Sequence, residues 1–292
     1  MRSQRTLKNE ISFSGVGLHT GRHVHVKLRP SSRDSGILFY RTDKGSFIKA
    51  NITSVIDSAY ATTIGNDEVK VKTVEHLLAA FSGLGIDNVI VELDGPEIPI
   101  LDGSATEIIG LILKAGIAKQ GKKAAYMRIA SPVIFKDSYS EIAVFPYNGR
   151  KITSRISFNH GILGEQTLSL DINEETFVRE IAPARTFGFL KDVQYLMTKG
   201  LARGGSLENA IILTEKGILN PSGLRFSDEF VRHKILDSIG DLSLLGMPIY
   251  GHIITDRAGH STNIRFLKYL ISRPDCWEIV SEADYMPPVL QI

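Results

Sequence analysis

The sequence has 292 residues, of which 43% are hydrophobic and 23% are charged, as in globular proteins with a sizeable apolar core. Its formal net charge of +2 provides no long-range field that attracts nucleic acid, so we expect no nucleic-acid partner. A single cysteine, Cys276, excludes an intramolecular disulfide framework, and residues 1–6 lack the apolar core of a secretory signal, so we expect a cytoplasmic protein. The apolar run at residues 108–117 contains Lys114 and is too short to cross a hydrocarbon layer of ~30 Å, so we expect no stable membrane insertion.

The first 120 residues show strand and helix patterns in turn. Apolar and polar residues alternate over residues 23–28, which is the two-residue period of a half-buried strand. Over residues 73–84 the apolar residues recur at helical spacing, and Thr73 is a candidate N-cap. A strand over residues 88–93 follows, and then a helix over residues 104–115 that Gly116 closes.

A polar stretch at residues 120–123 precedes a fresh set of strands, so we place a domain boundary there. The predicted domains are residues 1–122 and 123–292. Strands followed by helices in each half predict an α+β fold, not a doubly wound parallel sheet. The second half has predicted strands over residues 126–135, 141–146, 151–158 and 249–255, a long helix over residues 228–245, and a last helix after Ser261.

The helix at residues 228–245 has a polar face at about 100° per residue. A histidine and a carboxylate one helical turn apart, such as His233 and Asp237, can reach a single cation. They would provide two of the three protein ligands that a catalytic zinc site typically has. A solvated face with an intrahelical charge pair is the alternative. The polar residues of this face are His233, Lys234, Asp237 and Asp241.

Glu75 and His76 lie in the first turn of the helix predicted over residues 73–84. The helix dipole favours a carboxylate there, which would by itself explain Glu75. His76 could instead supply a third metal ligand, while Glu75 accepts a proton from metal-bound water, as in other zinc hydrolases.

Four other histidines and one glycine-containing turn are further candidates for a catalytic, metal-binding or anion-binding role. His260 follows a glycine in the loop after residues 249–255 and, taken alone, would be a surface histidine. His19, His23 and His25 are close in sequence and form an alternative metal site, which lacks an accompanying base. The Gly204-Gly205-Ser206 turn could bind an anion through backbone N–H groups, although it lacks the spacing and lysine of a phosphate-binding loop. No serine or cysteine stands in a recognisable nucleophile context.

Seven sequence blocks together resemble the family of UDP-3-O-acyl-N-acetylglucosamine deacetylases, which act in lipid A biosynthesis. They occur in one order across nearly the whole chain. Each block alone is weak, but the seven together are specific. The blocks lie at residues 14–21, 72–78, 98–104, 184–187, 204–209, 231–241 and 259–260.

The resemblance implies two tandem two-layer α/β sandwich domains with the active site between them. An insert in the second domain, at about residues 189–212, would form a hydrophobic passage for a fatty acyl chain. The implied cofactor is Zn²⁺, with Fe²⁺ as the ion that the same ligands accept in the cell. The implied partner is a small amphipathic UDP-sugar, and the implied enzyme is a monomer.

The resemblance also assigns roles to individual residues by position. His76, His233 and Asp237 would bind the metal. Glu75 would be the general base, and His260 the acid that protonates the leaving amine. The other implied site residues are Asp241, which orients His260; Thr186 and Lys234, which stabilise the oxyanion and bind substrate; Phe187 and His19, beside the sugar; Gly205 and Ser206, in the glycine turn; and Val193, Leu201 and Ile212, in the passage.

The implied activity is hydrolysis of the N-acetyl group of UDP-3-O-acyl-N-acetylglucosamine, the committed step of lipid A biosynthesis. One alternative is a zinc amidohydrolase that acts on a different acetylated nucleotide sugar, with the same site but without the passage. The other is a non-catalytic metal-binding or scaffold protein, in which Glu75 and His260 would have no purpose.

Overall fold

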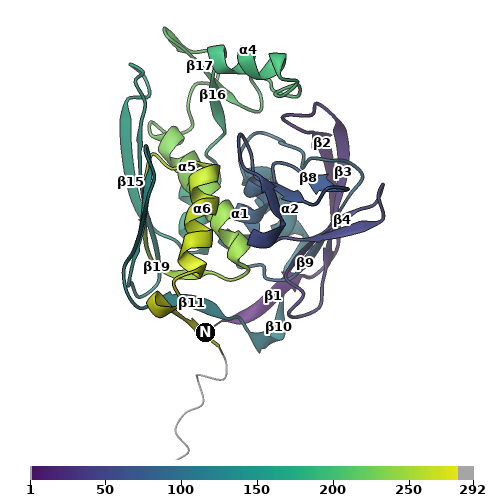
Figure 1. Cartoon of the computed structure of the whole chain (residues 1–292). Coiled ribbons are helices and arrows are strands. Elements are labelled where there is room, and N and C mark those ends of the chain that lie inside the picture. The colour runs from purple at the N-terminus through teal and green to yellow at the C-terminus, as the bar shows by residue number, and fades with distance from the viewer. Residues whose placement is uncertain (1, 282–292) are drawn as a thin grey trace, which may run out of the picture.

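Helices from both halves of the chain pack between two β-sheets in this computed structural model, which describes residues 2–281 (Figure 1). In Figure 1 the sheet of the first half lies on the right and the sheet of the second half on the left. Each half is a sheet covered by its own helices, which confirms the predicted α+β fold. The helices between the sheets are α1 (Glu75–Leu84), α2 (Thr106–Ala115), α5 (Glu229–Leu242) and α6 (His260–Ile271).

The first half contains a five-stranded sheet in the order β2-β3-β9-β4-β5. Val24, Val26 and Leu28 are buried on one face of β3, as their alternation with polar residues predicted. β9 pairs antiparallel with β3 and parallel with β4, so the sheet is mixed. The strands are β2 (Ile11–Val16), β3 (His23–Pro30), β4 (Ile37–Arg41), β5 (Ser46–Lys49) and β9 (Val89–Leu93).

The polar stretch at residues 120–123, where we placed the domain boundary, belongs to a strand. It forms part of β10 (Ile117–Lys123), which pairs antiparallel with β1 (Ser3–Leu7). Strand pairing uses backbone groups, so polar side chains are compatible with it where they face solvent. The division into domains 1–122 and 123–292 stays a prediction.

A further small sheet in the first half contains β6 (Val55–Asp57), β7 (Thr63–Gly65) and β8 (Lys70–Val71).

The second half contains a seven-stranded sheet built around β19. This strand pairs antiparallel with β13 and parallel with β11 and β14. The strand predicted over residues 126–135 is in fact two strands, because Pro132 between them lacks the N–H that a continuous ladder needs. The strands are β11 (Tyr126–Ile129), β12 (Val133–Lys136), β13 (Glu141–Phe145), β14 (Arg150–Ser157), β15 (Glu165–Asp171), β19 (Ile249–Asp256) and β20 (Trp277–Val280).

The insert predicted at about residues 189–212 projects from one end of the helix layer, at the top of Figure 1. It contains α4 (Leu190–Thr198), which connects the parallel strands β16 (Phe187–Phe189) and β17 (Ile211–Thr214). β18 (Gly217–Ile218) pairs with β17 and completes a three-stranded sheet. α4 has no buried residue, so this helix lies on the surface.

The two halves share one apolar core where α1 packs against α5. A single cluster of buried apolar side chains contains Leu77 of α1 together with Leu236 and Ile239 of α5. The two backbones approach closely at Gly240, where a Cβ would lie 2.1 Å from the carbonyl oxygen of Glu75. Only glycine permits this approach, so helices from both halves come into direct contact beside Glu75.

Two helix ends differ from the prediction. Thr73 does not cap α1, because its backbone is left-handed with φ of 56° and its hydroxyl donates to Glu97 at 2.8 Å. α5 ends at Leu242, and residues 243–245 form a 3-10 turn that stops at Gly246, with φ of 85°. Within residues 2–281, none of the helices has both the length and the apolar character that a bilayer span requires.

Candidate active site

Three buried side chains from two helices converge where a single ion would fit. His76 comes from α1, and His233 and Asp237 come from α5, as their one-turn spacing predicted. One donor atom from each lies within 4.8 Å of the other two. The Oδ1 atom of Asp237 is 3.6 Å from Nε2 of His76 and 3.2 Å from Nε2 of His233. No other group of three histidine, cysteine, aspartate or glutamate residues within residues 2–281 has donor atoms this close together.

The protonation of these three groups suits a metal ion. Nδ1 of His233 donates to the carbonyl oxygen of Ala184 at 3.0 Å, so the lone pair of Nε2 faces Asp237. Burial lowers the pKa of His76 and favours its neutral, ligating form. Burial acts to raise the pKa of Asp237, but its interactions with His233 and with the cation of Lys234 hold it well below its usual range.

The buried Oδ1 atom of Asp237, which faces both imidazoles, lacks a hydrogen-bond partner within residues 2–281. A buried acceptor without a partner is costly, and a cation at this point would satisfy it. Two imidazole nitrogens and one carboxylate oxygen could hold a divalent ion, and such a set is typical of catalytic zinc sites. The solvated-face alternative for α5 is wrong, because His233 and Asp237 are 3% exposed.

Glu75 and His260 face each other beside this group. Oε1 of Glu75 lies 3.9 Å from Nε2 of His260, and Oε2 accepts the backbone N–H of Thr62 at 3.0 Å. Burial raises the pKa of Glu75 to about 8, with smaller contributions from Asp241 and Asp237. Glu75 is therefore a carboxylate with the basicity that proton transfer near neutral pH requires.

His260 is the first residue of α6 and is not the surface histidine of the alternative interpretation. Its side chain is 13% exposed, and its Nδ1 donates to Oδ2 of Asp241 at 2.9 Å. Burial acts to lower the pKa of His260, but the carboxylates of Asp241 and Asp237 raise it to about 9. His260 is therefore cationic at neutral pH and carries a proton on Nε2.

Sequence reasoning missed two residues that hold Asp241. The amide of Asn263 donates to Oδ2 of Asp241 at 2.8 Å, and the hydroxyl of Thr62 donates to Oδ1. Asn263 lies on the same face of α6 as His260, three residues on, so its helical spacing was a usable signal. Thr62 lies just before β7 and has no local pattern that points to the site.

His19 is buried in a loop that a third missed residue holds. The carboxylate of Glu97 accepts the backbone N–H groups of His19 at 2.9 Å and Thr20 at 2.7 Å. Burial lowers the pKa of His19, with contributions from Lys72 and from His260, so the imidazole is neutral and near the acid. His23 and His25 are exposed, and His25 pairs with Asp94, so neither joins His19 around a common point.

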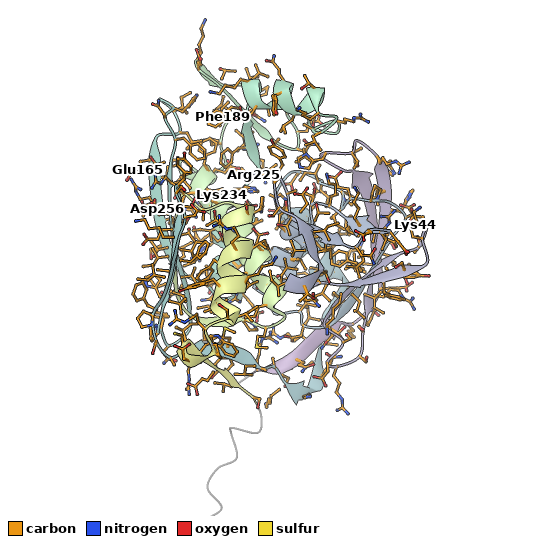
Figure 2. All side chains as sticks on the ribbon, viewed as in Figure 1. Lys44, Glu165, Phe189, Arg225, Lys234 and Asp256 are labelled. Atoms are coloured by element: carbon orange, nitrogen blue, oxygen red, sulfur yellow. The ribbon has the colours of Figure 1, made fainter. Side chains whose placement is uncertain are left out.

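Phe187 and Lys234 lie beside the candidate metal ligands, and Thr186 precedes Phe187 in the chain. Thr186 lies two residues after Ala184, and its backbone N–H donates to the carbonyl of Gly103 at 2.8 Å. The ring of Phe187 is 6.2 Å from that of His233. Nζ of Lys234 lies 2.9 Å from Oδ2 of Asp237, between the two sheets (Figure 2). Burial acts to lower the pKa of Lys234, but the charge of Asp237 raises it, so the side chain is cationic.

The other predicted substrate contacts lie in or near the insert. Val193, Leu201 and Ile212 are half-buried, and Gly205 and Ser206 are exposed. The backbone N–H of Gly204 donates to the carbonyl of Leu18 at 3.0 Å, so the glycine turn lies against the loop that contains His19. A Cβ at Gly204 would lie 2.3 Å from the carbonyl oxygen of Gly17, which explains the glycine.

Residues 4–272 match the family model described as UDP-3-O-acyl N-acetylglycosamine deacetylase. Three similar proteins carry the name UDP-3-O-acyl-N-acetylglucosamine deacetylase. That of Thermodesulfovibrio yellowstonii is 52% identical over 96% of this chain and 95% of its own. That of Syntrophotalea carbinolica is 44% identical over 96% and 92%, and that of Teredinibacter turnerae is 44% identical over the full length of both.

Proposed function

We propose, because this chain belongs to the UDP-3-O-acyl N-acetylglycosamine deacetylase family, that His76, His233 and Asp237 form its catalytic metal centre. The protein is an N-deacetylase of lipid A biosynthesis, and it hydrolyses the acetamide of UDP-3-O-acyl-N-acetylglucosamine in a metal-dependent reaction. The products are acetate and UDP-3-O-acyl-glucosamine. The family match does not favour a different acetylated nucleotide sugar as the substrate.

The observation that carries the proposed centre is the convergence of three donor atoms within 4.8 Å, one of them a buried oxygen without a hydrogen bond. We propose Zn²⁺ as the ion, because two nitrogens and one oxygen suit it, and Fe²⁺ as the ion that the same ligands also accept. A bound divalent ion supplies a Lewis acid for the acetyl carbonyl and a water of lowered pKa.

Glu75 and His260 divide the proton transfers in the proposed mechanism. Glu75 accepts the proton of the attacking water at Oε1, since Oε2 is already held by the N–H of Thr62. His260 carries its transferable proton on Nε2, because Nδ1 is engaged by Asp241. It donates this proton to the amide nitrogen, which leaves as an amine. The two atoms lie 3.9 Å apart, so both reach one small group between them.

Thr186 and Lys234 are proposed to stabilise the charge that develops on the acetyl oxygen. The hydroxyl of Thr186 forms no hydrogen bond within residues 2–281, so it can donate to substrate. Lys234 adds a buried cation beside Asp237. Loss of one such donor typically lowers kcat about 100- to 1000-fold.

We propose that the sugar lies against Phe187, His19 and the Gly205-Ser206 turn, and that the acyl chain lies along the insert. Val193, Leu201 and Ile212 would line this passage. Its support is the apolar surface of α4, where Tyr195 and Met197 are each 54% exposed. We further propose that the enzyme acts as a monomer in the cytoplasm, where a free cysteine such as Cys276 stays reduced.

The test of the proposed site is acetate release from UDP-3-O-acyl-N-acetylglucosamine by the full chain. We expect a chelator to abolish release and added Zn²⁺ to restore it. Glu75→Gln and His260→Gln should bind metal but lose about 100- to 10,000-fold in kcat. His25→Gln, an exposed histidine on β3, is the matched control and should keep wild-type activity. Full activity of both site variants would refute the assigned roles.

Metal content provides a separate test of the ligand set. His233→Ala removes a ligand and leaves the other two, so we expect zinc per chain, measured by elemental analysis after dialysis, to fall well below one. Glu75→Gln should keep its zinc, since we propose that Glu75 is not a ligand. An unchanged zinc content in His233→Ala would exclude His233 from the set.

A further inference from the structure

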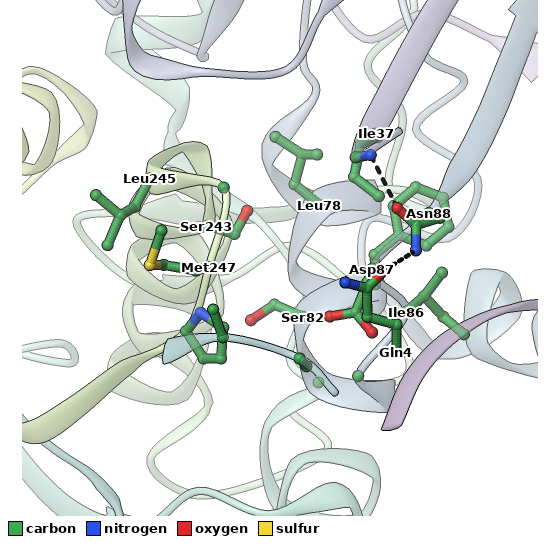
Figure 3. A pocket seen from close by; sticks show the side chains of 18 of the residues that line it. Gln4, Ile37, Leu78, Ser82, Ile86, Asp87, Asn88, Ser243, Leu245 and Met247 are labelled. Atoms are coloured by element: carbon green, nitrogen blue, oxygen red, sulfur yellow. Dashed lines mark hydrogen bonds between the residues drawn. The ribbon is translucent and has the colours of Figure 1, made fainter. Parts of the chain in front are cut away.

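A cavity lies between the two halves of the chain, and none of the proposed metal ligands lines it. It has a volume of about 590 Å³, within the range of about 300 to 1,000 Å³ that small-molecule sites occupy. Ser82 of α1 lines it, two helical turns or roughly 11 Å along the axis from Glu75. Figure 3 shows Ser82 and Leu78 of α1 with Leu245 and Met247 on one side and Ile86 on the other. Both halves of the chain therefore contribute walls.

Arg150, the first residue of β14, brings a cation into this cavity. Its Nη1 donates to the carbonyl oxygen of Ser82 at 3.3 Å, and its Nη2 to the hydroxyl of Ser82 at 3.0 Å. No carboxylate within residues 2–281 forms an ion pair with Arg150. Burial lowers the pKa of Arg150 to about 10, which still leaves it charged at neutral pH.

The partners of Arg150 satisfy only part of its guanidinium. Five N–H groups are available, and Ser82 accepts two of them. Ser82 lies in the last turn of α1, where the helix dipole adds only about half a negative charge. Arg150 is half-buried and has no carboxylate partner within residues 2–281, so its remaining N–H groups are free to bind an anion in the cavity.

The carboxylates around the cavity do not supply that anion, because each is paired with another cation. Lys49 also lines the cavity, is exposed, and forms no ion pair within residues 2–281. The uncompensated charge of the lining is therefore positive. The pairs are Arg2 with Asp87, Lys122 with Asp34, and Arg5 with Glu174.

We propose that this cavity binds a small amphipathic anion, whose carboxylate or phosphate is held by Arg150. The apolar body of the ligand would lie against Ile172, Leu245 and Met247, which line the same cavity. A guanidinium matches both headgroups, because two of its N–H groups can donate in parallel to two oxygens. The site is separate from the catalytic centre and does not depend on the metal.

Isothermal titration of the full chain with decanoate and with decyl phosphate tests this proposal and separates the two headgroups. We expect saturable binding of at least one anion and none of decanol, which lacks the charge. Arg150→Gln should weaken binding by about tenfold to a hundredfold, since it removes a charged hydrogen-bond donor. Arg265→Gln, an exposed arginine on α6, is the matched control and should bind as wild type.

Two further variants keep the result decisive. Met247→Trp leaves Arg150 in place but puts an indole ring where the apolar body of the ligand would lie, so it should weaken binding even if Arg150→Gln proves unstable. Lys234→Ala should keep binding, which separates this cavity from anion binding at the catalytic centre. Absence of binding to the wild-type chain, or equal binding by wild type and Met247→Trp, would overturn the proposal.

Discussion

Thr62 contacts the proposed base directly and the proposed acid through Asp241, although it would not touch substrate. Its backbone N–H holds Glu75, and its hydroxyl holds Asp241, whose other oxygen holds His260. One residue therefore sets the orientation of the base directly and of the acid through a carboxylate. We interpret Thr62 as a positioning residue of the catalytic centre.

Thr62→Val should lower kcat by about 10- to 100-fold, the usual effect of losing such an outer hydrogen bond, with KM changed by less than about threefold. The side chain keeps its shape but loses the hydroxyl, so Asp241 loses one donor. Thr62→Ser should restore most of kcat. Steady-state acetate release, with zinc content as a control for the metal site, measures this. A fall in KM and kcat together with lost zinc would indicate a structural role instead.

Some residues of the site could be predicted from local sequence patterns, and others could not. His233 and Asp237 are one helical turn apart, so their proximity follows from periodicity alone. Glu75 and His76 are adjacent in a helix and could be singled out. Thr62, 13 positions from Glu75 and 179 from Asp241, has its role only through the tertiary fold. Glu97 is likewise remote in sequence, 78 positions from His19, whose loop it holds.

At the scale of elements, the crossing of α1 and α5 determines how the proposed metal ligands meet. Gly240 permits the contact, and its flanking residues on α5 include Asp237 and Asp241. Hydrophobic periodicity predicted both helices but not their crossing, because no local pattern specifies which helices pack together. Thr73 failed as a predicted N-cap for a related reason, since Glu97 from a distant segment takes its hydroxyl.

Gly240→Ala should destabilise the protein by about 1–3 kcal/mol, the usual cost of overpacking, and lower kcat as well. A methyl group there would lie 2.1 Å from the carbonyl oxygen of Glu75 and push α1 away. Gly110→Ala, in α2, is the control, because a Cβ there meets nothing within 4 Å. That substitution should stabilise by up to about 1 kcal/mol through helix propensity. Urea unfolding of both variants would measure this, and equal midpoints would contradict the close crossing.

At the scale of the whole molecule, a buried ion pair connects the start of α5 to the segment before β16. Glu229 is fully buried and accepts Nε of Arg185 at 2.9 Å and the backbone N–H of Arg225 at 2.6 Å. Burial acts to raise the pKa of Glu229, but the hydrogen bonds from Arg185 and Arg225 lower it. The pair therefore depends on an ionised Glu229.

A carboxylate with a depressed folded pKa contributes stability above its unfolded pKa of about 4.3, and this is lost as pH falls through the folded value. We therefore expect the free energy of unfolding to fall as the pH is lowered below about 5, and Glu229→Gln to reduce the slope of that fall. Glu229→Gln should also be less stable than wild type at pH 7, because it leaves Arg185 buried without its counter-charge. Urea titrations across this pH range would measure both effects. If the free energy of unfolding of Glu229→Gln fell with the same slope below pH 5 as that of wild type, the assignment would be contradicted.

The arrangement of the halves was beyond what local patterns could predict. Strand and helix patterns indicated two α+β halves, and family resemblance supplied the site between them. Neither indicated that α1 and α5 would share one apolar core. Such long-range packing depends on shape matching between surfaces that are far apart in sequence.

The proposed metal ligands come from α1 and α5, which are far apart in sequence, and this has a consequence for the synthesis of the protein. During synthesis His76 emerges and can fold with its own half long before Asp237 has been made. A nascent chain therefore holds at most one of the three donors for most of its translation. The proposed metal centre can therefore assemble only after Asp237 has been made, so we expect shorter polypeptides to lack deacetylase activity.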